Sequence, residues 1–297
     1  MRLVSVIVAT YKREKELENA LKSLAQQTYP HMELVLVDDN GNDEWNIKVS
    51  KIVDSFRTAY PNIALKCLVN NPNQGSAKAR NIGINAANGY YITFLDDDDI
   101  YLPDKVRQQV EFMDAEECDY SITDLNLYNE DGKVIDRRIR SYIKDVSISA
   151  LKVYHLKYHM TGTDTMMFKK EYLMQIGGFA PIDVGDEFYL IQRAIEGGGK
   201  FGYLPGCEIK AYVHTGEDGG VSSGTGKIKG ENQLYDYKKQ FFGELKPETV
   251  RYIKARHYAV LAFAELRRKK YGAFGKNACK AVLFSPGACL DILKRAK

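Results

Sequence analysis

Two hydrophobic periods alternate along roughly the first hundred residues. Short apolar runs rich in β-branched side chains separate longer segments in which apolar residues recur every three or four positions. The first pattern is typical of buried strands and the second of amphipathic helices, and their alternation favours a largely parallel α/β sheet flanked by helices. Strands are predicted at residues 3–9, 33–37, 64–69 and 91–95.

Three helices are predicted between these strands. The first carries one apolar stripe and ends near Gln27, and the second carries a similar stripe. The third runs from 76 to about 87, and Ser76 opens it as a good N-cap residue. The two stripes consist of Leu17, Ala20, Leu21 and Leu24 in the first helix, and of Val49, Ile52, Val53 and Phe56 in the second.

The rest of the chain predicts a mixed α/β region followed by helices. The Gly-rich stretch 216–230 has the composition of a mobile loop that closes over a ligand as a lid. From residue 232 the pattern is helical, with breaks at Pro247 and at 285–287. The elements expected before that point are strands at 120–127 and 134–139, a loop around 161–164, and a helix from about 187 to 195.

Composition narrows the class of protein. The chain has 297 residues, of which 44% are hydrophobic and 27% charged, so collagen-like, low-complexity and disordered classes are excluded. Its five cysteines are scattered and form no CxxC pair, which predicts neither a disulfide framework nor a zinc site and favours a reducing, cytoplasmic setting. The first apolar run is too short for a signal peptide, and no stretch is apolar for about 18 residues.

Charge is unevenly distributed. The net charge is +3, but residues 240–297 hold 13 Lys and Arg against 4 Asp and Glu, which leaves a net charge of −6 for residues 1–239. Basic residues flank the apolar stripe of the predicted C-terminal helices. Such helices either lie on an anionic membrane surface, pack on the main domain, or contact a second subunit.

The predicted strands end in polar clusters. The carboxyl ends of parallel strands meet at one edge of a sheet, where ligands bind. Four consecutive aspartates, 96–99, follow the fourth strand, and carboxylates without Cys or His suit Mg²⁺ or Mn²⁺. The alternative is a turn before Pro103 without a metal. A metal of this kind completes its shell with substrate phosphates, and Arg80 lies on the neighbouring helix to bind them.

Two common nucleotide motifs are absent from the sequence. The segment 224–227 reads Gly-Thr-Gly-Lys, but Val221 and Ile228 occupy the positions where a P-loop needs Gly and Ser or Thr. No GxGxxG follows the first strand, where Thr10, Tyr11 and Lys12 stand instead. Dehydrogenase and ATPase functions therefore lose their main support.

Four motifs in order resemble glycosyltransferase family 2, whose members are inverting enzymes with the GT-A fold. They are VSVIVATY at 4–11, QTYP at 27–30 with ELVLVDD at 33–39, NQG at 73–75 with ARN at 79–81, and FLDDDD at 94–99 with Pro103. The resemblance implies a Rossmann-like catalytic domain at 1–231 with a basic helical appendage at 232–297. The nucleotide-binding half is expected at about 1–117 and the acceptor-binding half at about 118–231.

The resemblance also implies a set of donor-binding residues. Asp39 is similar to the carboxylate that accepts the uracil N–H group of a UDP-sugar, and Asp98 is similar to the direct ligand of Mn²⁺ or Mg²⁺. The other residues expected to bind the nucleotide are Thr10, Tyr11, Arg13, Asn71, Gly75, Arg80, Asp96 and Asp97.

An inverting transfer needs a carboxylate that takes the proton of the attacking hydroxyl group. In the family this base stands six residues before an Arg, and counting back from Arg193 reaches Glu187. Asp186 is the alternative base, and a third possibility is that both only cap the helix. His214 is expected at the metal or the diphosphate, unless it is structural. Residues expected at the sugar and acceptor are Thr163, Asp164 and Asp183.

The leading hypothesis is a metal-dependent glycosyltransferase that moves a sugar from a nucleotide diphosphate to a glycan or a lipid-linked acceptor at the cytoplasmic face of the membrane. A nucleotidyltransferase is the alternative enzyme, and it would release pyrophosphate from a nucleoside triphosphate. A binding module that retains the fold without chemistry is the non-enzymatic alternative. No nucleic-acid partner is expected, and oligomerisation stays open.

Overall fold

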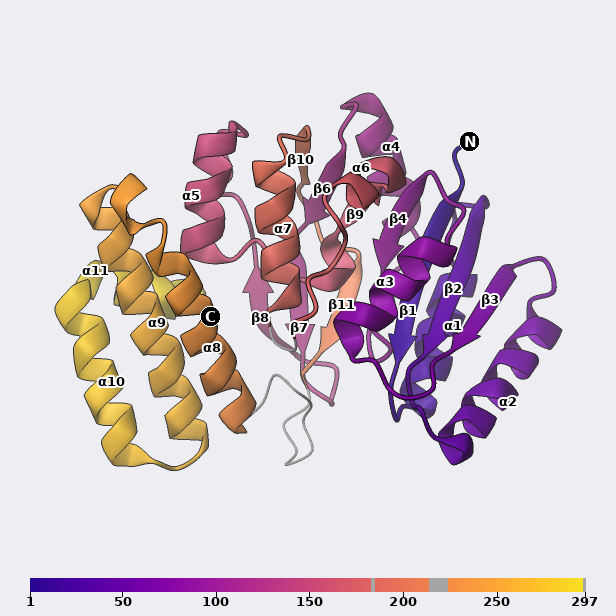
Figure 1. Cartoon of the computed structure of the whole chain (residues 1–297), viewed down its shortest axis with the longest axis horizontal. Helices are drawn as coiled ribbons and strands as arrows, with labels where there is room; N and C mark the ends of the chain where they lie inside the picture. The colour runs from indigo at the N-terminus through magenta and orange to yellow at the C-terminus, as the bar shows by residue number, and fades with distance from the viewer. Residues whose placement is uncertain (183–184, 214–223, 296–297) are drawn as a thin grey trace.

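The computed structural model describes residues 1–182, 185–213 and 224–295. Its main sheet has seven strands in the order β10-β6-β9-β4-β1-β2-β3 (Figure 1). All neighbours in this sheet are parallel except β9, which runs antiparallel to β4 and β6. The strands are β1 (Val4–Thr10), β2 (Met32–Asp38), β3 (Ala64–Val69), β4 (Tyr91–Phe94), β6 (Tyr120–Thr123), β9 (Met167–Lys169) and β10 (Phe201–Leu204).

The first four predicted strands are confirmed as the parallel half of this sheet. Their side chains alternate between two cores: Val6 packs with α1 (Lys15–Ala25) and α2 (Asp43–Ala59), whereas Ile7 packs with α3 (Ser76–Ala86) on the other face. The predicted cap of α3 was wrong by one residue. Gly75 is the N-cap, with φ of +83°, and Ser76 is the first helical residue.

The strand predicted at 120–127 is two strands in two sheets. Strand β6 ends at Thr123, and β7 (Leu125–Tyr128) joins a second sheet with the order β5-β11-β7-β8. The break falls at Asp124, whose buried carboxylate accepts hydrogen bonds from Arg140 N, Tyr203 OH and Gly206 N. The other strands of this sheet are β5 (Ile100–Tyr101), β8 (Val134–Arg138) and β11 (Ile209–Tyr212).

The prediction of a loop over 216–230 was wrong in its second part. Helix α8 (Gly224–Lys239) includes residues 224–230, and residues 214–223 lie outside the described chain. The glycines do not prevent the helix because it packs along α9 (Pro247–Arg267). The remaining helices are α4 (Lys105–Ala115), α5 (Ile148–Tyr158), η1 (Thr163–Thr165), α6 (Lys170–Gln175), α7 (Asp186–Glu196), η2 (Phe242–Glu244), α10 (Tyr271–Phe284) and α11 (Pro286–Arg295).

The C-terminal helices pack on the α/β core at its β8 end (Figure 1). Helices α5, α7, α8 and α9 share one apolar cluster, and α10 packs beside α9. The predicted breaks at Pro247 and 285–287 are confirmed, because Pro247 opens α9 and α11 begins at Pro286. Among the described residues no helix combines the length and apolar character needed to cross a bilayer. The shared cluster consists of Leu156, Phe188, Leu234, Phe241 and Ile253.

Candidate active site

The loop after β1 is tied to the loop after β4. Thr10 Oγ1 donates to Asp97 Oδ2 over 2.7 Å, and Tyr11 N donates to the same oxygen over 3.1 Å. Arg13 Nη2 donates to Asp98 Oδ2 over 2.8 Å. The structure therefore brings together five residues that the sequence predicted at the nucleotide-sugar donor or its metal. The guanidinium group of Arg13 lies beside the two aspartates.

Asp39 organises the loop that leads into α3. Its Oδ1 accepts from Asn70 Nδ2 and Gln74 N, and its Oδ2 accepts from Gly75 N, each over 2.8 Å. A carboxylate offers about four acceptor positions, and these three bonds leave one on Oδ2. Asn71, also predicted at the nucleotide, lies exposed in this loop. The carboxylate thus positions the loop and retains capacity for one further donor.

Arg80 links the two acidic segments of the site. From α3, its Nη2 donates to Asp96 Oδ1 over 2.7 Å and its Nη1 donates to Asp186 Oδ2 over 2.9 Å. Its guanidinium carbon lies 5.3 Å from the centre of the Phe179 ring, and only 12% of its side chain is exposed. The two carboxylates raise the pKa of Arg80 against the opposing effect of burial. One buried cation therefore holds together residues 90 positions apart in the chain.

Asp96, Asp99 and Asp164 form a carboxylate cluster in which one oxygen of each lies within 4.8 Å of the others. Asp164 Oδ1 accepts from Asp96 N over 2.8 Å, and Asp99 Oδ1 accepts from Tyr212 N over 2.7 Å. Burial and the neighbouring Asp96 raise the pKa of Asp164 to about 7. Asp164 was predicted at the sugar or acceptor, and the structure places it against the aspartate loop through the bond from Asp96 N.

The carboxylate oxygens of this cluster suit a hard divalent cation. The groups at 96–99 and 164 present carboxylate oxygens, which Mg²⁺ and Mn²⁺ prefer, and their mutual repulsion is what a bound cation relieves. Burial first and then Asp98 raise the pKa of Asp97 to about 7. Asp98 itself is not one of the three clustered residues; it is partly buried beside Arg13. Asp96 and Asp98 keep part of each side chain open to solvent, and Asp96 also belongs to the cluster with Asp99 and Asp164.

Sequence reasoning missed the support beneath this cluster. Lys105 is fully buried, and its Nζ donates to Thr93 Oγ1 over 2.6 Å and to Tyr101 OH over 2.7 Å. The Tyr101 hydroxyl also contacts the backbone carbonyl group of Asp164 at 3.1 Å. Burial lowers the pKa of Lys105 well below its ordinary value, and Asp164 opposes this. Nothing in the local pattern distinguishes Lys105 from a surface lysine.

Asp186 and Glu187 begin α7 and occupy different environments. Asp186 accepts a hydrogen bond from the guanidinium group of Arg80, whereas Glu187 Oε2 accepts a hydrogen bond from Gly162 N over 3.0 Å. Burial, then Asp186 and Asp96, raise the pKa of Glu187, and Arg80 opposes them. Burial also raises the pKa of Asp186, with Arg80 as the main opposing group. Asp186 is therefore ion-paired with a guanidinium, whereas Glu187 accepts a hydrogen bond from a backbone amide.

Thr163 lies beside Glu187 as a candidate substrate contact. Its side chain is buried, and its hydroxyl oxygen has no hydrogen-bond partner of good geometry among the described residues. It nevertheless lies near enough to Glu187 to lower the pKa of that carboxyl group. Such a buried group is costly unless a ligand satisfies it. Asp183 and His214, the other predicted contacts, lie outside the described residues.

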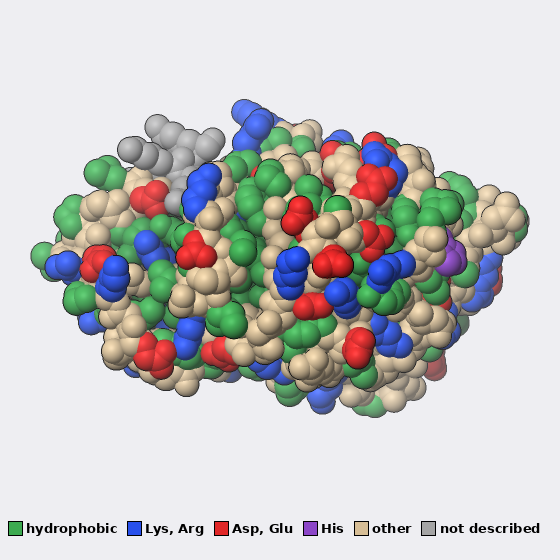
Figure 2. Space-filling model, turned by 90° about the horizontal axis from the view of Figure 1, so that it is seen from above, with side chains coloured by type: hydrophobic (Ala, Val, Ile, Leu, Met, Phe, Trp, Pro, Cys, Tyr) green, Lys and Arg blue, Asp and Glu red, His purple; other side chains and the backbone are tan. Residues whose placement is uncertain are grey.

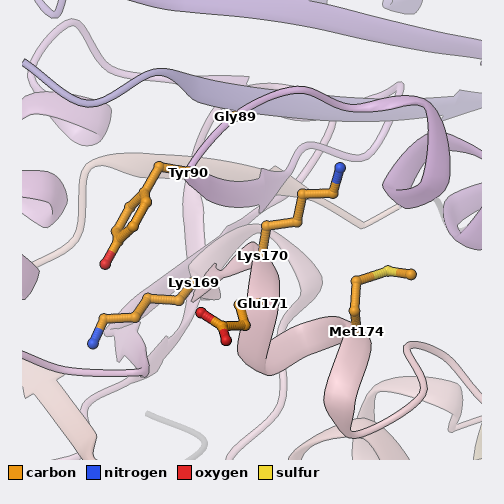
Figure 3. Close-up of a pocket in the computed structure, with 6 residues that line it drawn as sticks. All are labelled: Gly89, Tyr90, Lys169, Lys170, Glu171 and Met174. Carbon is orange, nitrogen blue, oxygen red and sulfur yellow. The ribbon is translucent and has the colours of Figure 1, made fainter.

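A separate pocket lies at the opposite edge of the sheet (Figure 3). Gly89 and Tyr90 precede β4, whereas the aspartate loop follows it. Lys170 extends toward the loop before β4, where its Nζ donates to the carbonyl oxygen of Ala87 over 2.6 Å. This pocket is therefore not part of the candidate active site. Its lining residues are Gly89, Tyr90, Lys169, Lys170, Glu171 and Met174.

Solved structures with a similar fold include glycosyltransferases that bind nucleotide sugars. Mannosyltransferase PcManGT from Pyrobaculum calidifontis, solved with GDP-Man and Mn²⁺, covers 97% of this chain and 80% of its own with a TM-score of 0.63 and 20% identity. S. aureus TarS 1–349 with UDP-GlcNAc covers 94% of this chain and 89% of its own with a TM-score of 0.60 and 19% identity. At these identities the likeness establishes the GT-A fold, which confirms the expected fold.

Sequence relatives are more similar over a shorter stretch. UDP-Glc:alpha-D-GlcNAc-diphosphoundecaprenol beta-1,3-glucosyltransferase WfaP of Escherichia coli is 36% identical over 136 residues, which are 46% of this chain and 50% of the relative. Putative teichuronic acid biosynthesis glycosyltransferase TuaG of Bacillus subtilis is 34% identical over 47% of this chain and 53% of its own. The chain thus spans about half the length of these relatives.

The profile of glycosyl transferase family 2 matches residues 5–180. That match covers more than half of the 297 residues and includes the loops after β1, β2 and β4 and all of α3. The chain belongs to glycosyl transferase family 2.

Proposed function

We propose that this chain is a metal-dependent, inverting glycosyltransferase that moves a sugar from a UDP-sugar to a hydroxyl group of a lipid-linked glycan. The observation that carries the proposal is the bridge from Asp96 through Arg80 to Asp186, since it joins the donor-side aspartate loop to the segment that holds Glu187. Family membership favours sugar transfer over nucleotidyl transfer and over a module without chemistry. The name of the relative WfaP, a UDP-Glc:alpha-D-GlcNAc-diphosphoundecaprenol glucosyltransferase, supports the donor and acceptor classes.

In this mechanism the chain positions both reactants. Arg13 and Arg80 are the cations that would neutralise the donor diphosphate, and Asp39 would accept one hydrogen bond from the nucleobase. Asp96 and Asp98 would hold Mn²⁺ or Mg²⁺, which supplies positive charge beside the leaving diphosphate. Glu187 takes the proton of the acceptor hydroxyl group while that oxygen attacks the anomeric carbon from the face opposite the diphosphate, which inverts the configuration. Thr163 orients the acceptor beside Glu187.

Nucleotide binding provides the first test. Titration calorimetry with UDP is expected to show at least about tenfold tighter binding with Mn²⁺ than with EDTA, because the cation would offset the negative charges of the aspartates and the phosphates. Asp98→Asn is expected to remove most of that difference. GDP serves as the matched nucleotide and is expected to bind more weakly. Equal UDP affinity with and without Mn²⁺ contradicts the proposed role of the metal.

The identity of the base is tested by two conservative substitutions. Glu187→Gln is expected to lower kcat by about 10²–10⁴ while leaving UDP–Mn²⁺ affinity within about twofold, since it removes the proton acceptor and keeps the shape. Asp186→Asn retains an acceptor for Arg80 and is expected to cost less. Transfer assays and calorimetry on both variants measure this.

The pH dependence is the control for that experiment. Because the pKa of Glu187 is raised and the base must be ionised, kcat/KM of the natural chain is expected to fall as pH drops through this raised pKa, above the range of an ordinary carboxyl group. The fall should disappear in Glu187→Gln. An unchanged rate in both variants, or an identical acid limb in Glu187→Gln, rules out the assignment.

We further propose that the C-terminal helices contact an anionic membrane, where a lipid-linked acceptor resides. Helices α10 and α11 expose Leu283 by 83%, Tyr271 by 66% and Leu290 by 60%, on a segment rich in lysine. Seen from above, this end of the molecule shows apolar side chains among charged ones (Figure 2). Such a surface suits the boundary between headgroups and acyl chains.

Vesicle sedimentation tests the membrane contact. The chain is expected to bind vesicles that contain phosphatidylglycerol more than neutral ones, and to lose most of that binding in high salt. Leu283→Asp is expected to weaken binding at least about fivefold, since it places a charge in the apolar contact. Ile47→Asp, at a position 56% exposed on α2, is the matched control without effect. Equal losses in the two variants argue against this surface.

A further inference from the structure

Two cations converge on one nitrogen where α5, α8 and α9 meet. Lys238 of α8 is 2% exposed, and its Nζ contacts His159 Nε2 at the end of α5. Arg256 Nη1 of α9 lies 2.9 Å from the same nitrogen. A buried donor, Lys238, and a partly buried one, Arg256, therefore share one acceptor atom.

Among the residues that the structure describes, this arrangement leaves one of the two side chains without a full partner at that nitrogen, and burial, then Arg256, lower the pKa of Lys238 well below its ordinary value. A neutral imidazole nitrogen has one lone pair, so His159 Nε2 accepts a good hydrogen bond from Lys238 or from Arg256, but not from both. Burial, then Arg256 and Lys238, hold the pKa of His159 well below its ordinary value, which keeps the ring neutral. A buried charge that lacks a partner is costly, and an anion removes the cost.

The surroundings add positive charge. Burial, followed by the nearby Arg267 and Arg138, lowers the pKa of Lys227 on α8, and Arg138 also acts on Arg256. Among the described residues, Glu231 is the carboxylate that raises the pKa of both Lys238 and Arg256, against the larger effect of burial. Glu231 also pairs with His257 over 3.1 Å.

A second carboxylate, Asp291, is linked to this region through Tyr252. Its Oδ2 accepts from the hydroxyl group of Tyr252, one turn before Arg256 on α9, over 2.7 Å. The group of cations around His159 therefore exceeds the acids that the described chain places there. Guanidinium and ammonium groups gathered in this way suit an anion with two or more charges, such as a diphosphate.

The cluster adjoins the candidate base on the acceptor side. Gly162, which donates to Glu187, follows His159 by three residues, so the two Cα atoms are at most about 11 Å apart. Phe188, which follows Glu187, stacks on the ring of His155 at 4.0 Å and contacts that of His159 at 5.1 Å.

We propose that Lys238 and Arg256 bind the diphosphate of the lipid-linked acceptor, so that the hydroxyl group of its sugar reaches Glu187. The proposal rests on the proposed function for the identity of the acceptor, and on the two converging cations for the site itself. Lys238 and Arg256 thus select acceptors that carry a diphosphate, while the aspartate loop binds the donor at the other end of the site.

Binding of inorganic pyrophosphate tests the site without any transfer reaction. Calorimetry is done on the full chain saturated with UDP and Mn²⁺, which blocks the donor site. Lys238→Met and Arg256→Gln are each expected to weaken pyrophosphate binding at least about tenfold, the loss of one charge-assisted contact. The matched controls are Lys239→Met, at a residue paired with Asp236 and largely exposed, and the exposed Arg251→Gln on α9. Equal affinity in all five proteins overturns the proposal.

Acceptor kinetics then distinguish a lipid diphosphate from free phosphate compounds. With a sugar-diphosphate-lipid acceptor, Lys238→Met and Arg256→Gln are expected to raise the acceptor KM at least about tenfold and leave UDP–Mn²⁺ affinity unchanged. With the same sugar as an uncharged alkyl glycoside they are expected to match the natural chain. A similar loss on both acceptors indicates a purely structural role and overturns the proposal.

The two hypotheses fail in different ways. Weakened pyrophosphate binding in the variants, combined with no transfer by the natural chain, refutes the proposed function and retains the anion site. Normal transfer with unchanged acceptor KM refutes the anion site alone. Unfolding midpoints control for misfolding. Burial, then Arg256, lower the pKa of Lys238 well below its ordinary value, so Lys238→Met puts an apolar side chain where a charge is poorly tolerated and is expected to keep or raise the midpoint.

Discussion

The buried guanidinium of Arg80 is the interaction on which the arrangement of the candidate site depends. It pairs with Asp96 after β4 and with Asp186 at the start of α7, on top of the Phe179 ring. Without this cation, the two carboxylates would repel each other in a partly dehydrated space. Arg80 therefore sets the distance between the donor loop and the segment that carries Glu187.

Charge is divided along the chain in a way that fits the proposed reaction. The strand ends supply carboxylates for a cation, and Arg13 and Arg80 supply the counter-charges. The C-terminal helices supply Lys238 and Arg256 at the end of α5, where we propose that the acceptor diphosphate binds. The basic residues of the C-terminal helices are thus of two kinds. Some lie on the outer face, where we propose a membrane contact, whereas Lys238 and Arg256 contact His159 at the end of α5.

Local features of the sequence predicted the first half well because each strand and its polar end are contiguous in the chain. Thr10, Asp39 and the aspartate run were found in this way, and the structure places them at one edge of the sheet. Contacts between distant segments were not predictable. Lys105 under the cluster has no local signal, and Asp124 ends a strand only because Arg140, Tyr203 and Gly206 surround it. Helix α8 depends in the same way on its packing against α9.

The central claim is that Arg80 couples the aspartate loop at 96–99 to the start of α7, which carries Asp186 and the proposed base Glu187. A double-mutant cycle with Arg80→Gln and Asp186→Asn, measured as kcat/KM for sugar transfer on folded proteins, tests it most directly. We expect that the effects do not add, with a coupling of about 0.5–3 kcal/mol, because each change removes the same ion pair even where a neutral hydrogen bond remains. Effects that add to within about 0.3 kcal/mol contradict it.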